Sequence, residues 1–202
     1  MRMKPLKIGV AGPVGSGKTS IIEQLTNLFK TTHTVAIVTN DIYTKEDANY
    51  LKKHLDIPCE RIVGVETGGC PHTAIRDDIS MNKKACEELE KNFSLDIIFV
   101  ESGGDNLSAT FSYELVDFYM YIIDVAQGGD IPRKKGAGLL YSDLLIVNKT
   151  DLAPYVDVDL DQMLSDVESN RKNKPFVFVS KTDPESLEKI KEWILALMDV
   201  PL

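Results

Sequence analysis

The chain has 202 residues, of which 43% are hydrophobic and 27% charged, and its formal net charge is −8. These values fit one globular domain over residues 1–202, and the acidic balance argues against non-specific binding to nucleic acid or anionic membranes. The first residues lack an apolar signal-peptide core, and no apolar run approaches the roughly 18 residues of a membrane span, so we expect a cytoplasmic protein. Three cysteines, an odd number, do not suggest a disulfide framework.

The first motif is a G-x-x-x-x-G-K-[ST] phosphate loop at Gly12–Thr19. A short apolar run of buried-strand type, Leu6–Ala11, precedes it, and apolar residues at helical spacing follow it. Strand, glycine-rich loop and helix is the context in which backbone N–H groups bind phosphate oxygens, which disfavours a chance glycine-rich turn. The residues expected to hold the nucleotide here are Gly12, Pro13, Val14, Gly15, Ser16, Gly17, Lys18, Thr19 and Ser20.

Magnesium in such sites takes a loop hydroxyl, phosphate oxygens, waters and one or two carboxylates. Lys18 would reach the β- and γ-phosphates, and Thr19 would place its hydroxyl on Mg²⁺. Asp41, Glu66 and Glu101 each follow an apolar run, so each is expected at the carboxyl end of a strand. We prefer Asp41 and Glu66 as the magnesium carboxylates, and expect Lys18, Asp41 and Glu101 to be catalytic. Acids at strand ends are also common as helix caps, which is the alternative for each.

The segment Glu101-Ser102-Gly103-Gly104 stands where Ras-type proteins carry D-x-x-G. Its glycine N–H groups are placed to sense a γ-phosphate. A catalytic glutamine of the Ras type cannot be assigned in this chain.

A Cys-Pro-His triplet at Cys70–His72 places a thiol and an imidazole around a proline. These are good ligands for Ni²⁺, Zn²⁺ or copper, and the proline stiffens the loop between them. Two ligands do not complete a site, but a two-fold axis between subunits would supply a second pair. Spacing alone favours the alternative of a buried cysteine beside a histidine that caps a helix. The other histidines and cysteines lie elsewhere in the sequence: His33, His54, Cys59 and Cys86.

The second nucleotide motif is N-K-x-D at Asn148–Asp151, directly after an apolar run. The Asp151 carboxylate can accept hydrogen bonds from the guanine N1–H and 2-amino group, donors that adenine does not offer in that arrangement. Asn148 can brace the loop, and the stem of Lys149 can cover the ring. Ser180 would belong to a second loop near the base. The alternative is an ordinary turn in which Asp151 serves as a cap.

Apolar, β-branched runs alternate with helical patterns along the chain, which predicts an α/β fold with a doubly wound, mainly parallel sheet flanked by helices. One helical pattern extends from Ile75 to Phe93, and the last helix opens at Asp183-Pro184 with a cap and a first-turn proline. Loops are expected at 103–104 and 127–138. The remaining predicted strands are 34–39, 61–65, 96–100, 118–125, 143–147 and 175–179.

Taken together, these motifs make the chain resemble the UreG family of urease accessory GTPases, a branch of the SIMIBI class of P-loop NTPases. The resemblance covers nearly the whole chain, and the Cys-Pro-His triplet after Glu-Thr-Gly-Gly is distinctive of the family. It reverses the expectation from spacing alone and implies that Cys70 and His72 bind metal. The most specific stretches are Gly12–Thr19, Thr39–Asp47, Val65–His72, Glu101–Asn106 and Asn148–Asp151.

The resemblance also implies a mechanism. GTP and Mg²⁺ order the loops that carry Asp41, Glu66 and Glu101, and two subunits close Cys70 and His72 around one Ni²⁺, with Zn²⁺ a possible substitute. Hydrolysis then releases nickel to apo-urease. The implied partners are a second copy of the chain, other urease accessory proteins and a nickel metallochaperone.

Three other functions remain open. The first is nickel insertion into another metalloenzyme such as hydrogenase, against which the Cys-Pro-His triplet argues. The second is a small-molecule kinase, against which the guanine motif argues. The third is a signalling GTPase without a metal role, in which Cys70 and His72 would be structural.

Overall fold

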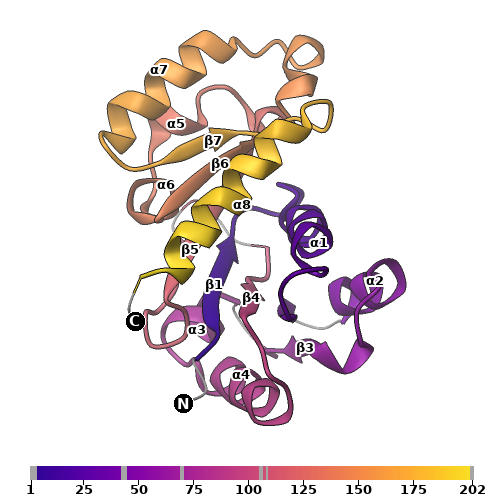
Figure 1. Ribbon diagram of the computed structural model, residues 1–202. Coiled ribbons are helices and arrows are strands. Elements are labelled where there is room, and N and C mark those ends of the chain that lie inside the picture. Colours follow the sequence, from indigo (N-terminus) through magenta and orange to yellow (C-terminus); the bar gives the residue numbers. More distant parts are fainter. Residues whose placement is uncertain (1–3, 42–44, 69–70, 105–106, 108, 201–202) are drawn as a thin grey trace.

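Seven parallel strands form one sheet in the computed structural model, which describes residues 4–41, 45–68, 71–104, 107 and 109–200 (Figure 1). The strands lie in the order β3-β2-β4-β1-β5-β6-β7, so the chain winds outward in both directions from β1. This confirms the predicted doubly wound α/β fold. The strands are β1 (Leu6–Ala11), β2 (Val35–Asp41), β3 (Ile62–Glu66), β4 (Ile97–Glu101), β5 (Phe118–Asp124), β6 (Leu144–Asn148) and β7 (Phe176–Phe178).

Several strands extend further than their apolar runs predict. β2 ends at Asp41, β4 at Glu101 and β6 at Asn148, and the ladder still pairs Asp41 with Glu66 and Asp124 with Asn148. Backbone pairing does not depend on side-chain polarity, so the apolar run stops before the ladder does. The polar residues predicted just after the strands are therefore their last residues, held by the sheet itself.

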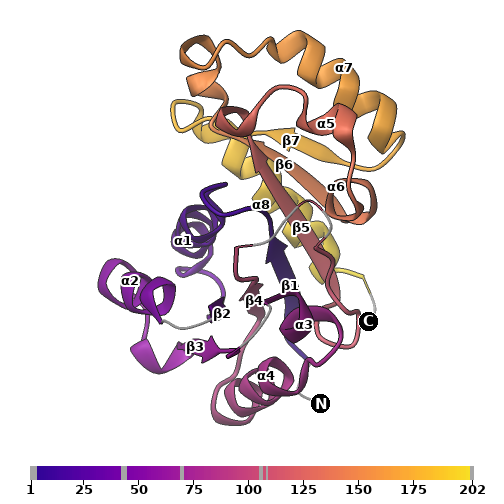
Figure 2. The same cartoon turned by 180° about the vertical axis from the view of Figure 1, so that it is seen from behind.

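Helices cover both faces of the sheet, and each face has its own apolar core. One face packs against α1 (Lys18–Phe29), α2 (Glu46–His54) and α8 (Pro184–Met198), which bring in residues such as Ile22, Leu51 and Ile190 (Figure 1). The opposite face carries α3 (Pro71–Arg76), α4 (Ser80–Asn92), α6 (Ala137–Tyr141) and α7 (Leu160–Arg171) (Figure 2). Among the described residues, no helix combines the length and apolar character that a bilayer span requires.

The helical pattern predicted from Ile75 to Phe93 is interrupted in the structure. The α3 helix closes where the N–H groups of Asp77 and Asp78 both bond to the carbonyl of Thr73. The carboxylate of Asp78 then accepts the Ser80 hydroxyl at 2.6 Å and its N–H at 3.2 Å, which starts α4. Those bonds hold the pKa of Asp78 below its usual range. Both helices face the same core, which explains why one apolar period runs across the break.

The predicted loop 127–138 contains regular structure, so that expectation is wrong in part. It holds the short helix α5 (Ile131–Lys134) and the first residues of α6, and it follows a 3₁₀ turn, η2 (Val125–Gln127). Glycines and a proline in this stretch obscure any apolar period. Two further 3₁₀ turns are η1 (Cys59–Arg61) and η3 (Thr150–Tyr155).

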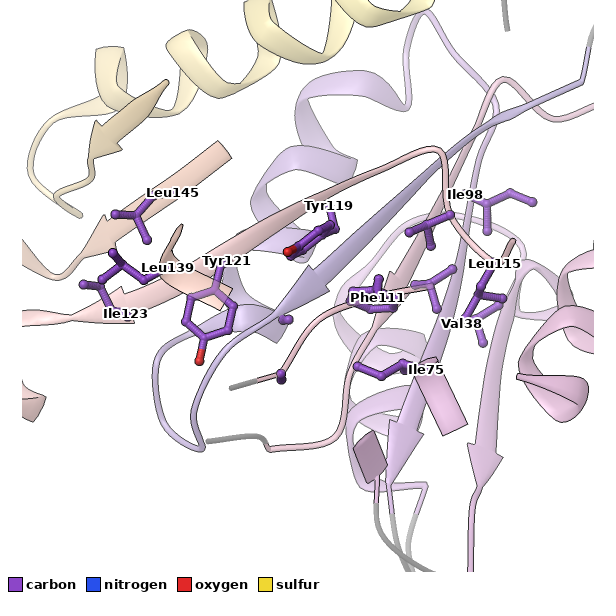
Figure 3. Close-up of a cluster of buried hydrophobic side chains, with 14 of the residues drawn as sticks. Val38, Ile75, Ile98, Phe111, Leu115, Tyr119, Tyr121, Ile123, Leu139 and Leu145 are labelled. Atoms are coloured by element: carbon purple, nitrogen blue, oxygen red, sulfur yellow. The ribbon is translucent and has the colours of Figure 1, made fainter. Parts of the chain in front are cut away.

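Aromatic side chains take part in the core on the face that carries α3, α4, α6 and α7 (Figure 3). The segment between β4 and β5 crosses this face and inserts Phe111 beside Tyr119, with ring centroids 6.0 Å apart. A Cβ added at Gly9 of β1 would lie 2.6 Å from the Phe111 ring, so this strand needs a glycine to admit it. Burial raises the pKa of Tyr119 well above its ordinary value, so its phenol stays neutral.

A buried arginine organises the far end of the sheet. Arg171, the last residue of α7, is 2% exposed, and its guanidinium donates to the carbonyls of Leu139 at 2.7 Å, Ser142 at 2.9 Å and Pro175 at 2.6 Å. Burial lowers its pKa to about 10, so it remains charged at neutral pH. One side chain thus ties α7 to the segments that lead into β6 and β7.

Replacing this arginine should therefore destabilise the fold strongly. Arg171→Met keeps much of the volume but strands buried carbonyls that each cost about 1–3 kcal/mol, so we expect a loss of at least about 3 kcal/mol. Urea unfolding followed by circular dichroism measures it. The matched control is Lys172→Met at the exposed neighbouring residue. Equal unfolding midpoints for the two variants would contradict the role given to Arg171.

Candidate functional site

A cavity of about 470 Å³ opens at the carboxyl ends of the central strands. In doubly wound folds, ligands bind at this edge of the sheet, near the point where the strand order reverses. The phosphate loop forms its floor, as the sequence predicts. Its other lining residues come from α2 and from the ends of β2 and β4: Asn40, Asp47, Tyr50, Glu101 and Gly104.

Side chains from other parts of the chain hold the phosphate loop by donating hydrogen bonds to its main-chain carbonyls. Val14 accepts a hydrogen bond from Gln127 Nε2 at 3.3 Å, Gly15 from Lys149 Nζ at 2.5 Å, and Ser16 from Asn148 Nδ2 at 2.9 Å. In a trans peptide the N–H points away from the C=O. Anchoring these carbonyls therefore leaves the N–H groups of the glycines that line the cavity to face a phosphate.

Gly17 shows why the loop needs glycine where its backbone comes close to Asn148. Its φ is 95°, a left-handed conformation, and a Cβ there would clash with the amide of Asn148. Lys18 follows at the start of α1, where its side chain is buried and its Nζ donates to the carbonyls of Gly12 at 3.0 Å and Pro13 at 3.2 Å. The ammonium group thus lies over the loop, ready to exchange carbonyl oxygens for phosphate oxygens.

Lys149 and Asp124 connect the two nucleotide motifs. Lys149 has a φ of 58°, and its ammonium group bonds to both Gly15 O and Asp124 Oδ2, the latter at 3.1 Å. Asp124 is 1% exposed at the end of β5 and also accepts the N–H of Ala126 at 2.7 Å. Asp124 and Gln127 were not expected at the site from the sequence. Their only signal in the sequence is a polar residue at the end of a buried strand, followed by a glycine-rich stretch.

Asp151 is oriented by the loop that carries Ser180. Its Oδ1 accepts the Ser180 hydroxyl at 3.2 Å and the N–H of Lys181 at 3.3 Å. The Ser180 hydroxyl is braced in turn by Thr182 at 2.7 Å. The structure thus brings together the two loops that the sequence placed beside the base, which gives the carboxylate a defined orientation.

The strand-end acids do not occupy equivalent positions. Glu101 is 1% exposed, and its Oε1 accepts the Thr19 hydroxyl at 2.6 Å. Glu66 is about half exposed and pairs with Lys45 at 3.7 Å. Asp41 ends β2 opposite Glu66, but its side chain lies outside the described residues. Among the described side chains, the carboxylate in contact with the Thr19 hydroxyl is therefore that of Glu101, whereas Asp41 and Glu66 were the magnesium carboxylates preferred from the sequence.

The hydroxyl of Thr19 and the carboxylate of Glu101 form a set of hard oxygen donors at the wall of the cavity. Such a set fits Mg²⁺, which binds through a few protein oxygens together with phosphate oxygens and water. Nothing in the described donor set is soft, so this part of the cavity is unsuited to a thiophilic metal.

The α2 helix forms the outer wall of the cavity. Tyr50 stacks on His54, with ring centroids 4.0 Å apart, and its hydroxyl donates to Glu23 of α1 at 3.1 Å. That bond raises the pKa of Tyr50, because an ionised phenolate could not donate to Glu23. Asp47 and Tyr50 thus line the cavity, although the sequence did not indicate them as site residues. They lie on a helix of nine residues in which only Ala48 and Leu51 are buried, so its apolar pattern is weak.

The Cys-Pro-His triplet lies at the start of α3. Cys70 is outside the described residues, and of His72 the structure describes the backbone, within the first turn of α3. The described residues contain no group of three or more histidine, cysteine or acidic side chains able to hold a metal. Cys86 is buried in the core, which raises the pKa of its thiol to about 12. Cys59 is exposed in the η1 turn that precedes β3.

Comparison with known proteins gives the family. Residues 6–178 match the model of the CobW/HypB/UreG nucleotide-binding domain. The chain is 74% identical to the urease accessory protein UreG of Aliarcobacter butzleri, over 96% of this chain and 99% of that one. It is 58% identical to UreG of Lysinibacillus sphaericus, over 95% and 92%.

Solved structures agree on the fold. HypB from Helicobacter pylori, in complex with nickel, superposes with a TM-score of 0.79 at 24% identity, covering 96% of this chain and 87% of that one. HypB from Archaeoglobus fulgidus gives 0.77 at 19% identity, covering 97% and 91%. At this identity the likeness establishes the fold alone, whereas the near full-length match to UreG proteins confirms the resemblance noted from the motifs. The chain therefore belongs to the UreG family of urease accessory proteins, GTPases built on the CobW/HypB/UreG nucleotide-binding domain.

Proposed function

We propose that the protein binds GTP in the cavity above the sheet and uses its hydrolysis to control the delivery of nickel into urease. The observation that carries this proposal is the direct bonding of the guanine motif to the phosphate loop, through Asn148 to Ser16 and through Lys149 to Gly15. These bonds connect the loop that would bind the base to the loop that would bind the phosphates. Ordering either loop therefore helps to order the other, so that the base and the phosphates would bind cooperatively.

Each nucleotide contact has a proposed residue. Backbone N–H groups of Gly12–Ser20 hold the phosphates, and Lys18 neutralises the β- and γ-oxygens. Asp151, oriented by Ser180, accepts from the guanine edge, while the stem of Lys149 covers the ring.

The proposed magnesium site uses Thr19, with Asp41 and Glu66 as the carboxylates expected from sequence and Glu101 as the carboxylate in contact with Thr19. Magnesium would neutralise charge that develops on the phosphate oxygens. Gly104, beside Val14 of the phosphate loop, is placed to sense whether a γ-phosphate is present. Lys18, Asp41 and Glu101 are the side chains proposed to support hydrolysis.

Nickel is proposed as the cargo, held by Cys70 and His72 of two subunits in the GTP-bound dimer. Zinc would accept the same ligands, because thiolate and imidazole bind both metals. The proposal is supported by the triplet in the sequence and by the position of its last two residues, Pro71 and His72, at the start of α3, the helix that follows β3. The proposed partners are other urease accessory proteins, a nickel metallochaperone and apo-urease.

Asp151→Asn should change the base that the protein selects. The amide cannot accept both guanine donors and presents an N–H instead, so GTP affinity should fall by about 100-fold or more, and xanthosine triphosphate, with a 2-oxo acceptor, should bind better. Fluorescence titration with labelled nucleotides measures both. Asp157→Asn, an exposed acid in the following turn, is the matched control. An Asp151 variant that still prefers GTP would exclude this residue as the base reader.

Removing the triplet's ligands should separate nucleotide binding from metal binding. Cys70→Ala and His72→Ala should bind GTP as the unaltered protein does, yet lose nickel in the GTP-bound state, because a thiolate or an imidazole is missing from each subunit. Competition with a chromogenic chelator measures nickel, and activation of apo-urease measures delivery. Cys59→Ala, another cysteine outside the core, is the control. Normal nickel delivery by Cys70→Ala would show that the site assignment is wrong.

A further inference from the structure

A chain of buried amides runs from the nucleotide cavity to the helix that follows the Cys-Pro-His triplet. We propose that Asn82, on α4, is a positioning residue that couples the nucleotide state of the cavity to the orientation of α3 and thereby to metal binding. This inference rests on the proposed function. It adds the residue that transmits the signal.

The amide chain has three hydrogen bonds. Asn40 Nδ2 donates to the main-chain carbonyl of Glu101 at 2.9 Å. Asn82 Nδ2 donates to Asn40 Oδ1 at 2.8 Å and to the carbonyl of Ala74, in α3, at 2.9 Å. Asn40 is 1% exposed and Asn82 is fully buried, so no water competes for these bonds. Four elements, β2, β4, α3 and α4, therefore meet through two side chains.

The direction of the bonds is fixed by their chemistry. Both N–H groups of Asn82 are used by two oxygens, so reversing its amide would set oxygen against oxygen at each contact. Asn82 Oδ1 has no donor within the described part of the chain. Without water in the interior, breaking one hydrogen bond of the amide chain leaves a buried polar group unsatisfied, which is costly. When one end of the amide chain shifts, a matching shift of the other end therefore costs less than a broken bond.

One end of the amide chain lies where the nucleotide acts. Asn40 lines the cavity and immediately precedes Asp41, the expected magnesium ligand. Glu101, whose carbonyl Asn40 holds, accepts the Thr19 hydroxyl through its carboxylate. Magnesium would take a lone pair of the Thr19 oxygen while the hydroxyl still donates to Glu101, so an ion in the cavity would act on both side chains and on the ends of β2 and β4.

The other end lies in the short helix that begins with Pro71 and His72. The α3 helix has six residues, and a second tie holds it, from the N–H of Ser112 to the carbonyl of Ile75 at 2.9 Å. Ile75 also packs in the core near Phe111 (Figure 3). With Ile75 fixed, the bond from Asn82 to Ala74 sets how the first turn of α3 is directed. That turn carries His72.

The composition of α4 supports a role beyond packing. Four residues of this helix are buried, and three of them, Ala85, Cys86 and Leu89, are apolar or thiol side chains typical of a core. Asn82 is the exception and leaves one acceptor without a described donor. An apolar residue would avoid that cost, so the amide serves a purpose that packing does not require.

Asn82→Leu tests the proposal, because leucine keeps the volume and removes the hydrogen bonds. Nickel affinity is measured by chelator competition with GDP and with a non-hydrolysable GTP analogue, and the ratio of the two affinities is the coupling. In the unaltered protein this ratio should be at least about fivefold. In Asn82→Leu it should fall to nearly one, while the affinity for the GTP analogue measured without nickel is unchanged.

The control is Asn170→Leu in α7, where the amide also donates to two backbone carbonyls, those of Pro132 and Asp166. It should keep the full ratio. If Asn82→Leu altered nickel affinity equally in both nucleotide states, Asn82 would be merely structural and the proposal overturned. If the unaltered protein showed no dependence on nucleotide, the proposed function itself would fail, and this inference with it.

Hydrogen exchange in the unaltered protein gives a second test, should Asn82→Leu fail to fold. The N–H groups of Asp77 and Asp78 close α3 on the carbonyl of Thr73. Their protection should differ between the GDP and GTP-analogue states if α3 is reoriented. Identical exchange of these amides in both states would overturn the proposal.

Discussion

The bonds between the guanine motif and the carbonyls of the phosphate loop are the constraint on which this site depends. Asn148 and Lys149 reach the loop from the end of β6, and Gln127 adds a third bond from the end of β5, the strand between β6 and β1. A glycine-rich loop on its own would sample many conformations. Fixed at three successive carbonyls, it presents its N–H groups before any phosphate arrives, and the cost of ordering it is met by folding rather than by binding.

The parallel sheet makes this arrangement possible, because all its strands end at the same edge. Asp41, Glu66, Glu101, Asp124 and Asn148 are each the last residue of a strand, and the ladder fixes their spacing. The same edge leads into α3. In the coupling that we propose, a change at the nucleotide would reach α3 through a few packed side chains, without a large movement of domains.

Much of this could be predicted from the sequence, because the phosphate loop, the N-K-x-D motif and the apolar strands are local signals. The roles of Asp124, Gln127 and Asn82 could not, since each depends on a partner distant in sequence. Glu101 was underestimated for the same reason, because its contact with Thr19 spans 82 positions. The break between α3 and α4 was missed because one apolar face continues across it, and α5 was missed because glycine and proline hide short helices.

The central claim is that the nucleotide decides whether two subunits share a metal. Light scattering after size exclusion tests it, with Ni²⁺ and either GDP or a non-hydrolysable GTP analogue, and with nickel content measured on the same peak. The account predicts a dimer with about one nickel per two chains in the GTP-analogue state alone, as four ligands from two subunits require. The same mass and the same nickel content in both nucleotide states would contradict it.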